Sequence, residues 1–227
     1  MSVAISEACR GERLSLNIFI CGVGGQGLVL LTRVIGDACA RSGEKAVTGE
    51  MYGLSQRSGV VSVHLRIGED AFSPLIPYGE ADIIVALEAV ESLRYIEYLE
   101  KDGIVLMNKR IMHPPIETSK ILTAKGEAKY IAVEDVVSKL KNWTQNIAVI
   151  DALKLARESG NARTENTVFL GCLSALEAFP VEESYIKESI AGAVPKKTVA
   201  QNLKAFELGR KNAYGSLCTL VPCRYKA

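Results

Sequence analysis

A glycine-rich loop between an apolar segment and an amphipathic one constrains the fold of this chain more than any other feature. Asn17–Cys21 is a short apolar run, and the sequence Gly22-Val-Gly-Gly-Gln-Gly27 follows it directly. Apolar residues then recur with helical spacing over residues 28–42, and Gly43 stands where a helix commonly ends. The pattern predicts a buried strand, a tight turn and a helix, which together begin an α/β sheet.

The alternation of strands and helices continues to about residue 160. Val60–Ile67 alternates apolar and polar residues, and Ala81–Leu87 is an almost continuous apolar run. Further strands are predicted at residues 45–48, 104–107, 129–133 and 146–150, with helices at 88–100, from 134 and from 151. This order predicts a Rossmann-like, open, mainly parallel sheet with helices on both faces.

The last third of the chain is predicted to be helical, with helices at residues 164–179, 182–193 and 197–214. The first of these is apolar nearly all round, which predicts a buried helix. Residues 1–15 are expected to form a leader, and residues 16–227 a single domain with this helical C-terminal portion.

Composition and charge argue against several classes of protein. A net charge of +1 provides no strong positive electrostatic field to attract a phosphate backbone, so we expect no nucleic-acid partner. No apolar run approaches the roughly 20 residues that span a bilayer, and the first residues do not resemble a secretory signal. The six cysteines are scattered without a C-x-x-C, and the two histidines lie far apart. We therefore expect reduced cysteines, no metal or Fe–S site on this chain, and a cytoplasmic location.

The glycine loop admits two interpretations. Its spacing satisfies G-x-G-x-x-G, glycines let a backbone approach a ligand closely, and the N-terminus of the next helix suits phosphate. Glu50 lies roughly where a dinucleotide site has its ribose-binding acid, so one hypothesis is an NAD(P)-binding oxidoreductase that acts alone. The other is that the glycines only form a tight turn.

Two further loops are candidates for ligand binding. Gln56-Arg57-Ser58-Gly59 follows the second predicted strand, where Arg57 can bind a carboxylate or phosphate, or the segment is a solvated turn. In Asn161–Asn166, Thr164 is a credible helix N-cap, whereas Arg163 and Asn166 are functional candidates. No Ser-His-Asp or Cys-His arrangement is supported by its context, so no catalytic residue is predicted.

The ordered set of segments resembles the gamma-type subunit family of pyruvate and 2-oxoacid:ferredoxin oxidoreductases. Within that family the segments look like those of the beta subunits of indolepyruvate ferredoxin oxidoreductases. The resemblance rests on residues 22–27, 55–59 with the following VVSVHLRIGED, 73–77 with 79–82, 151–156, 161–166 and 170–171, and it covers residues 16 to about 210.

The resemblance implies an accessory subunit that is inactive alone. The complex would oxidatively decarboxylate a 2-oxoacid, such as indolepyruvate or another arylpyruvate, to an acyl-CoA and pass electrons to ferredoxin. It implies a large partner subunit that carries thiamine diphosphate and Fe–S clusters, an apolar patch for that partner, coenzyme A as a candidate ligand of this chain, and a homodimer as one state of the isolated chain. It assigns cofactor binding to Gly22, Gly24, Gly25, Gln26, Gly27, Gln56, Arg57, Ser58 and Gly59.

Overall fold

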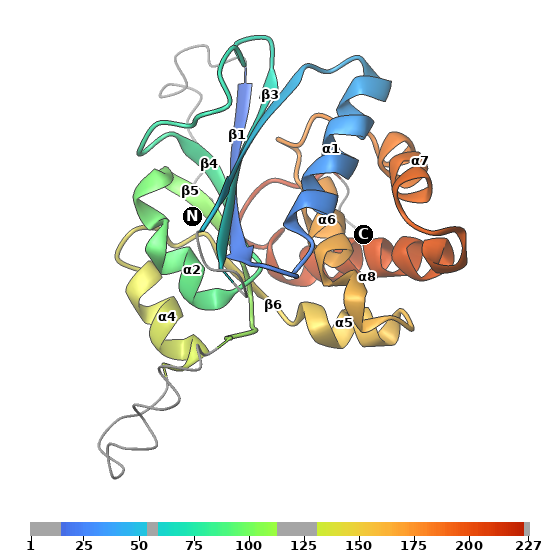
Figure 1. The fold of residues 1–227 in the computed structure, drawn as a ribbon. Coiled ribbons are helices and arrows are strands. Elements are labelled where there is room, and N and C mark those ends of the chain that lie inside the picture. The colour runs from blue at the N-terminus through green and yellow to red at the C-terminus, as the bar shows by residue number, and fades with distance from the viewer. Residues whose placement is uncertain (1–14, 54–58, 113–130, 225–227) are drawn as a thin grey trace.

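One open six-stranded sheet organises the chain (Figure 1), in the order β2-β3-β1-β4-β5-β6. The structure is a computed structural model and describes residues 15–53, 59–112 and 131–224. The strands are β1 (Ser15–Val23), β2 (Ala46–Tyr52), β3 (Val60–Gly68), β4 (Ala81–Ala86), β5 (Leu99–Asn108) and β6 (Ile147–Ile150). The α/β class and the open, mainly parallel sheet are as predicted.

Strand β3 alone runs opposite to the others. It pairs antiparallel with both β1 and β2, whereas the pairs β1–β4, β4–β5 and β5–β6 are parallel. The connection from β2 to β3 is too short for a crossover helix, so the chain can only turn back antiparallel. As a consequence, β3 separates β2 from β1, unlike the arrangement in a dinucleotide-binding unit.

Helices cover both faces of the sheet, as predicted. Helices α2 (Ala89–Arg94) and α4 (Val133–Leu140) lie on one face, seen at the left in Figure 1. The opposite face carries α1 (Leu28–Ser42), α5 (Ala152–Glu158), α6 (Glu165–Ala175), α7 (Glu183–Ala193) and α8 (Val199–Ser216). Short 3-10 helices are η2 (Ile96–Tyr98), η3 (Ala162–Thr164) and η4 (Lys196–Thr198).

Strand β1 shows why its sequence is apolar on both sides. Ile18 and Ile20 pack into the core beneath α1, whereas Phe19 and Cys21 pack into the core beneath α2. All four side chains are fully buried. A strand covered on both faces reads as a continuous apolar run rather than an alternating one.

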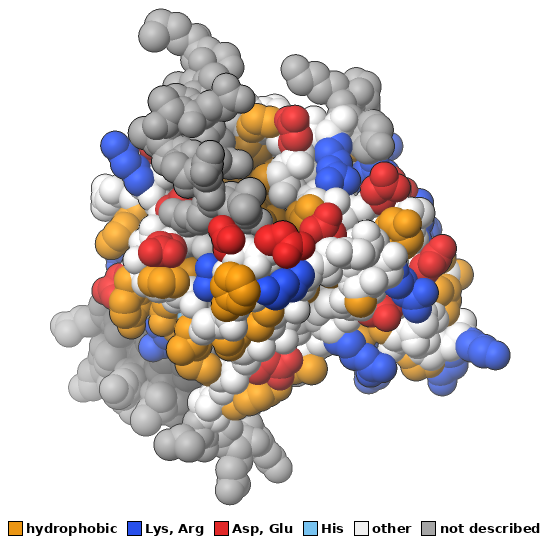
Figure 2. Space-filling view, turned by 90° about the horizontal axis from the view of Figure 1, so that it is seen from above, with side chains coloured by type: hydrophobic (Ala, Val, Ile, Leu, Met, Phe, Trp, Pro, Cys, Tyr) orange, Lys and Arg blue, Asp and Glu red, His pale blue; other side chains and the backbone are white. Residues whose placement is uncertain are grey.

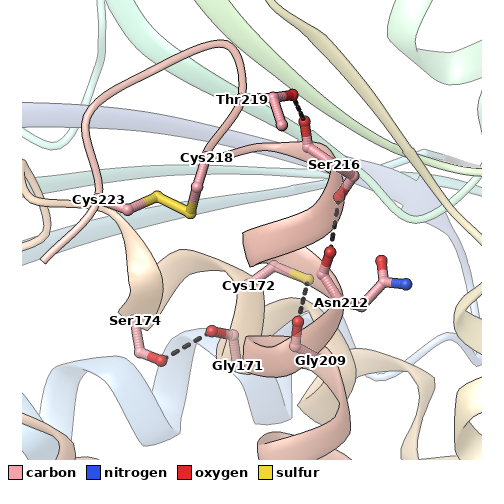
Figure 3. Close-up of a disulfide and its surroundings, with 9 residues drawn as sticks. All are labelled: Gly171, Cys172, Ser174, Gly209, Asn212, Ser216, Cys218, Thr219 and Cys223. Atoms are coloured by element: carbon pink, nitrogen blue, oxygen red, sulfur yellow. Dashed lines mark hydrogen bonds between the residues drawn. A yellow bond between two sulfur atoms is a disulfide. The ribbon is translucent and has the colours of Figure 1, made fainter. Parts of the chain in front are cut away.

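The C-terminal helices pack closely through two glycines. A Cβ on Gly171 of α6 would lie 2.0 Å from the Phe206 carbonyl oxygen, and one on Gly209 of α8 would lie 2.0 Å from that of Val168. Cys172 donates from Sγ to the Gly209 carbonyl oxygen at 3.2 Å (Figure 3). Every residue of α6 after Glu165 is buried, which agrees with the predicted burial of this helix.

A disulfide closes the turn that follows α8 (Figure 3). It joins Cys218 to Cys223, and Cys223 forms a β-bridge with Leu176 just after α6. The expectation of reduced cysteines is wrong for this pair, which the tight turn brings together and which helps to hold the last described residues against the end of α6. The remaining cysteines of the described chain are free and buried, as their apolar surroundings predicted: Cys21, Cys39 and Cys172.

Several predicted boundaries differ from the structure. Ser15, assigned to the leader, opens β1 opposite Gly68, and residues 1–14 lie outside the described chain. The helix expected at 88–100 ends at Arg94, because its later apolar residues belong to η2 and to the start of β5. The strand expected at 129–133 is wrong over its described part, where Val133 begins α4 instead.

Candidate ligand site at the carboxyl edge of the sheet

The glycine loop lies at the edge where β1, β4, β5 and β6 end, at the bottom of Figure 1. After β1 the chain enters α1 on one face of the sheet, and after β4 it enters α2 on the other. The two neighbouring strands therefore send their helices in opposite directions. Open α/β sheets bind ligands in the crevice at such a switch point.

The glycines of this loop have different physical roles. A Cβ on Gly22 would lie 2.6 Å from Gln26 Oε1, and one on Gly27 would lie 2.9 Å from Asn166 Nδ2, so both positions are restricted by packing. Gly25 has φ 93° with no atom within 4 Å of a built Cβ, so its backbone angle, not packing, favours glycine. Gly24 and Gly25 are exposed and present open backbone at the edge.

Gln26 holds the loop in place with its side chain. Its Oε1 accepts from the Val23 N–H at 2.8 Å, and its Nε2 donates to the Leu87 carbonyl oxygen at 2.8 Å. These bonds connect the end of β1 to the end of β4. Gln26 therefore shapes the loop with its amide, while the neighbouring Gly24–Gly25 backbone faces outward.

Gly59 brings the second predicted loop to the first. The Gly24 N–H donates to the Gly59 carbonyl oxygen at 2.9 Å, so these two sequence motifs are in contact at the same edge. The other members of the second motif, Gln56, Arg57 and Ser58, lie outside the described residues.

The N-terminus of α1 points to this edge without a side-chain cap. Gly27 occupies the N-cap position with φ 79°, makes no side-chain cap hydrogen bond, and no acidic residue follows in the first turn. The unpaired N–H groups and the helix dipole give such an end a partial positive charge. The described part of the edge thus presents groups suited to an anion.

The start of α6 packs beside the start of α1. Asn166 donates from Nδ2 to the Gly27 carbonyl oxygen at 3.2 Å, and its own buried Oδ1 has no hydrogen-bond partner within the described residues. Thr164 makes no side-chain cap; its hydroxyl donates to the Asn161 carbonyl oxygen at 2.8 Å. Of this segment's predicted candidates, Asn166 therefore touches the glycine loop, whereas Arg163 is exposed.

A polar group that the sequence analysis missed extends the site across β5. Asn108, only 1% exposed, donates from Nδ2 to the Leu87 carbonyl oxygen at 3.0 Å and to Glu165 Oε2 at 3.1 Å. Arg110 donates from Nη1 to Glu165 Oε1 at 2.5 Å. The available signal was the sequence Asn108-Lys-Arg110 directly after an apolar strand, at the edge where ligands bind.

Acidic side chains near β4 stabilise the backbone and do not activate the nearby cysteine. The Glu88 carboxylate accepts from the Glu91 and Met112 N–H groups, both at 2.9 Å. Burial raises the pKa of Glu91. Burial, followed by the charges of Glu91 and Glu88, raises the pKa of the Cys21 thiol well above its ordinary value. Cys21 is therefore a protonated core thiol and not a nucleophile.

Glu50 is not placed to bind a ribose beside the glycine loop. It lies on β2, which β3 separates from β1, so the strands are roughly 10 Å apart. Its carboxylate accepts a hydrogen bond from the Tyr52 hydroxyl on the same strand. The NAD(P) hypothesis thus loses the acidic residue on which it depended.

Neither a metal cluster nor a membrane helix is found in the described parts of the chain. Over residues 15–53, 59–112 and 131–224, no three His, Cys, Asp or Glu side chains are grouped to hold a metal ion. None of the helices there combines the length and apolar character needed to cross a bilayer.

A second distinctive surface lies at the opposite, amino edge of the sheet. We call the connection between β3 and β4, residues 69–80, the amino-edge loop. It exposes three large apolar side chains: Phe72 is 84% exposed, Leu75 57% and Tyr78 68%. Figure 2, which looks onto this edge, shows hydrophobic side chains gathered on the left half of the molecule.

The amino-edge loop is anchored to the sheet beneath it. The Ile76 N–H donates to His64 Nδ1 at 3.0 Å, and a Cβ on Gly49 would lie 2.9 Å from the Pro74 side chain. Lys45 Nζ lies 4.0 Å from the centre of the Phe72 ring. The exposed apolar side chains are therefore presented by a loop with fixed attachments. An aromatic cluster continues below: Phe19, His64, Tyr78, Tyr95 and Tyr98.

The fold and the edge define the chain as a mixed-sheet α/β protein with an anion-suited loop at its switch point. A family model described as pyruvate ferredoxin/flavodoxin oxidoreductase matches residues 17–212. The chain belongs to this family. It is 44% identical over 200 residues to the indolepyruvate oxidoreductase subunit IorB of Thermococcus kodakarensis, covering 87% of this chain and 95% of that protein.

Solved structures show the same fold at lower identity. The gamma subunit of a keto/oxoacid ferredoxin oxidoreductase from Geobacter sulfurreducens aligns with a TM-score of 0.64 at 21% identity, over 89% of this chain and 98% of that one. A 2-oxoglutarate:ferredoxin oxidoreductase from Magnetococcus marinus, with 2-oxoglutarate, coenzyme A and succinyl-CoA bound, aligns with a TM-score of 0.66 at 21% identity. That alignment covers 90% of this chain and 32% of the other. The curated relatives are named as subunits of 2-oxoacid oxidoreductases, which agrees with the predicted resemblance.

Proposed function

We propose that this chain is the accessory subunit of a ferredoxin-dependent oxidoreductase that decarboxylates indolepyruvate or another arylpyruvate to an acyl-CoA. The observation that carries the proposal is its 44% identity, over nearly the whole of both chains, to a subunit of an indolepyruvate oxidoreductase. In this proposal the larger partner subunit binds thiamine diphosphate and the Fe–S clusters, and this chain contributes to binding of coenzyme A.

The carboxyl edge suits the phosphates of coenzyme A. Phosphates are bound by backbone N–H groups and by the positive end of a helix dipole. The exposed Gly25 backbone and the uncapped start of α1 supply both kinds of group at one place, beside the Gly24 N–H that donates to Gly59. Gly22, Gln26, Gly27 and Gly59 then serve to shape that loop.

The amino-edge loop suits the larger subunit. Aromatic side chains are enriched at protein interfaces, and a few of them commonly contribute most of the binding energy. Phe72, Leu75 and Tyr78 are exposed on a loop that hydrogen bonds and packing already hold in place. Little ordering entropy would be lost when a partner covers them.

Co-expression with the larger subunit tests the proposal. We expect ferredoxin reduction that depends on both an arylpyruvate and coenzyme A in the purified complex, and no such activity from either subunit alone. Turnover of a 2-oxoacid by the isolated chain, or full activity of the larger subunit without it, would contradict the proposal. Binding of NAD to the isolated chain at micromolar Kd, about −8 kcal/mol, would instead favour the self-sufficient oxidoreductase.

A further inference from the structure

We propose that Arg110 binds a phosphate group of coenzyme A and is oriented for this by Glu165 and Asn108. This inference rests on the proposed function and adds a residue to it. Arg110 lies two residues beyond β5, at the same edge as the glycine loop. Its side chain is 38% exposed, so it is accessible to a ligand.

A continuous series of hydrogen bonds joins the glycine loop to Arg110. Gln26 and Asn108 both donate to the Leu87 carbonyl oxygen, at 2.8 and 3.0 Å. The second Asn108 amide bond reaches Glu165 Oε2, and Glu165 Oε1 accepts from Arg110. The loop, the end of β4, the end of β5 and the start of α6 are therefore connected by side chains at one edge.

The series fixes Arg110 from its buried side. Asn108 is 1% exposed and uses its Nδ2 for two bonds, so it has little freedom to rotate. The Glu165 side chain is 12% exposed and holds Arg110 by one guanidinium nitrogen. A guanidinium carries five N–H donors, and within the described residues the bond to Glu165 is the one that the Arg110 side chain makes. The remaining donors are available on the accessible side.

The chemistry of a held guanidinium matches that of phosphate. Arginine binds phosphate oxygens through paired N–H donors, and a pre-oriented side chain loses less entropy on binding. Coenzyme A offers two kinds of phosphate, the diphosphate and the 3′-phosphate.

Steady-state kinetics of the assembled complex test the assignment. We expect Arg110→Met to raise the KM for coenzyme A about tenfold or more, as expected for losing a charged hydrogen bond. The kcat at saturating coenzyme A and the KM for the 2-oxoacid should stay unchanged. Arg110→Lys should restore part of the affinity, because it keeps the charge without the planar donors.

The analogue 3′-dephospho-coenzyme A identifies the phosphate. If Arg110 binds the 3′-phosphate, Arg110→Met raises the KM for coenzyme A but leaves the KM for the analogue unchanged. If Arg110 binds the diphosphate, the KM rises by the same factor for both ligands. Glu165→Gln tests the positioning role: it keeps the size of the side chain and should raise the KM for coenzyme A severalfold, again without changing the KM for the 2-oxoacid.

A matched control and a variant-free measurement complete the test. Arg94→Met removes a cation that also pairs with a glutamate, Glu91, but lies on α2, and should leave the KM for coenzyme A unchanged. In the wild-type complex, coenzyme A should protect Arg110 from phenylglyoxal, read by mass spectrometry, even if the variants fail to fold. An unchanged KM in an active Arg110→Met complex, or no protection, overturns this inference. A wild-type complex that does not need coenzyme A overturns the proposed function instead.

Discussion

The two edges of the sheet are built from different interactions. At the carboxyl edge, amide side chains bond to carbonyl and carboxylate oxygens, and glycines leave backbone exposed. At the amino edge, aromatic rings stack beneath a loop that exposes large apolar side chains. Hydrogen-bonded networks fix geometry, which a small charged ligand requires, whereas apolar area drives association, which a protein partner requires. This difference supports our proposal that the ligand binds at the carboxyl edge and the partner subunit at the amino edge.

The largest expected effect is on binding of the larger subunit, and it should come from changes at the amino edge. Replacing Phe72, Leu75 and Tyr78 together by serine should weaken binding of the larger subunit by more than about 100-fold, because buried apolar anchors are lost. The isolated chain should keep its circular dichroism spectrum, since these side chains are exposed. Affinity is measured by biolayer interferometry, with Leu220→Ser as a control for an exposed apolar residue elsewhere. Unchanged affinity of the triple variant would remove the partner from the amino edge.

Gln26→Leu tests whether the carboxyl edge depends on hydrogen bonds. We expect the free energy of unfolding to fall by about 2 kcal/mol, because the Val23 N–H loses its acceptor. Gln26→Glu is the matched variant, since it keeps an acceptor for Val23 but sets a carboxylate oxygen against the Leu87 carbonyl oxygen in place of the donor. It should also lower the free energy of unfolding, because the two oxygens repel each other, and it tests the Leu87 contact separately from the Val23 contact. Urea denaturation measures both, and equal stability of Gln26→Leu and wild type would show that packing alone holds this loop.

His64 provides a pH test of the amino edge. Burial lowers the pKa of His64 below its ordinary value of 6.5, and its Nε2 has no partner within the described residues. The unfolded chain then binds the proton more readily, so stability is present above pH 6.5 and is lost as the pH falls below it. His64→Gln should reduce this loss, which is measured by urea denaturation at pH 7.5 and at acidic pH. An identical pH dependence in both proteins would assign the effect to other groups.

The smallest effect concerns Tyr98 at the same edge. Burial, followed by the hydrogen bond with Tyr78, raises the pKa of Tyr98 to about 12 from its ordinary value of 10. The unfolded chain loses this proton first, so stability is lost as the pH rises from 10 towards 12. Tyr98→Phe should change stability little at neutral pH and remove a tyrosine step near pH 12 in an ultraviolet titration. A wild-type step that persists in the variant would contradict the assignment.

Local patterns predicted the elements near the glycine loop well. The helix at residues 28–42 and its Gly43 end were predicted with the bounds that the structure has, because helical spacing and a C-terminal glycine are local signals. Gly24 and Gly59 were identified separately, and the structure shows them bonded. The Asn108–Glu165 bond was not predictable, because it joins residues 57 positions apart and depends on strand order.

The sequence by itself determined the α/β class, the glycine turn, the buried character of α6 and the family. These follow from periodicity, glycine placement and motif order, all of which are properties of neighbouring residues. Only the tertiary structure decided the reversal of β3, the separation of Glu50 from the glycine loop and the connection of Gln26 to Arg110. Strand order depends on which arrangement buries the apolar faces of all the strands and helices together. It is therefore determined by contacts between distant segments rather than within any one segment.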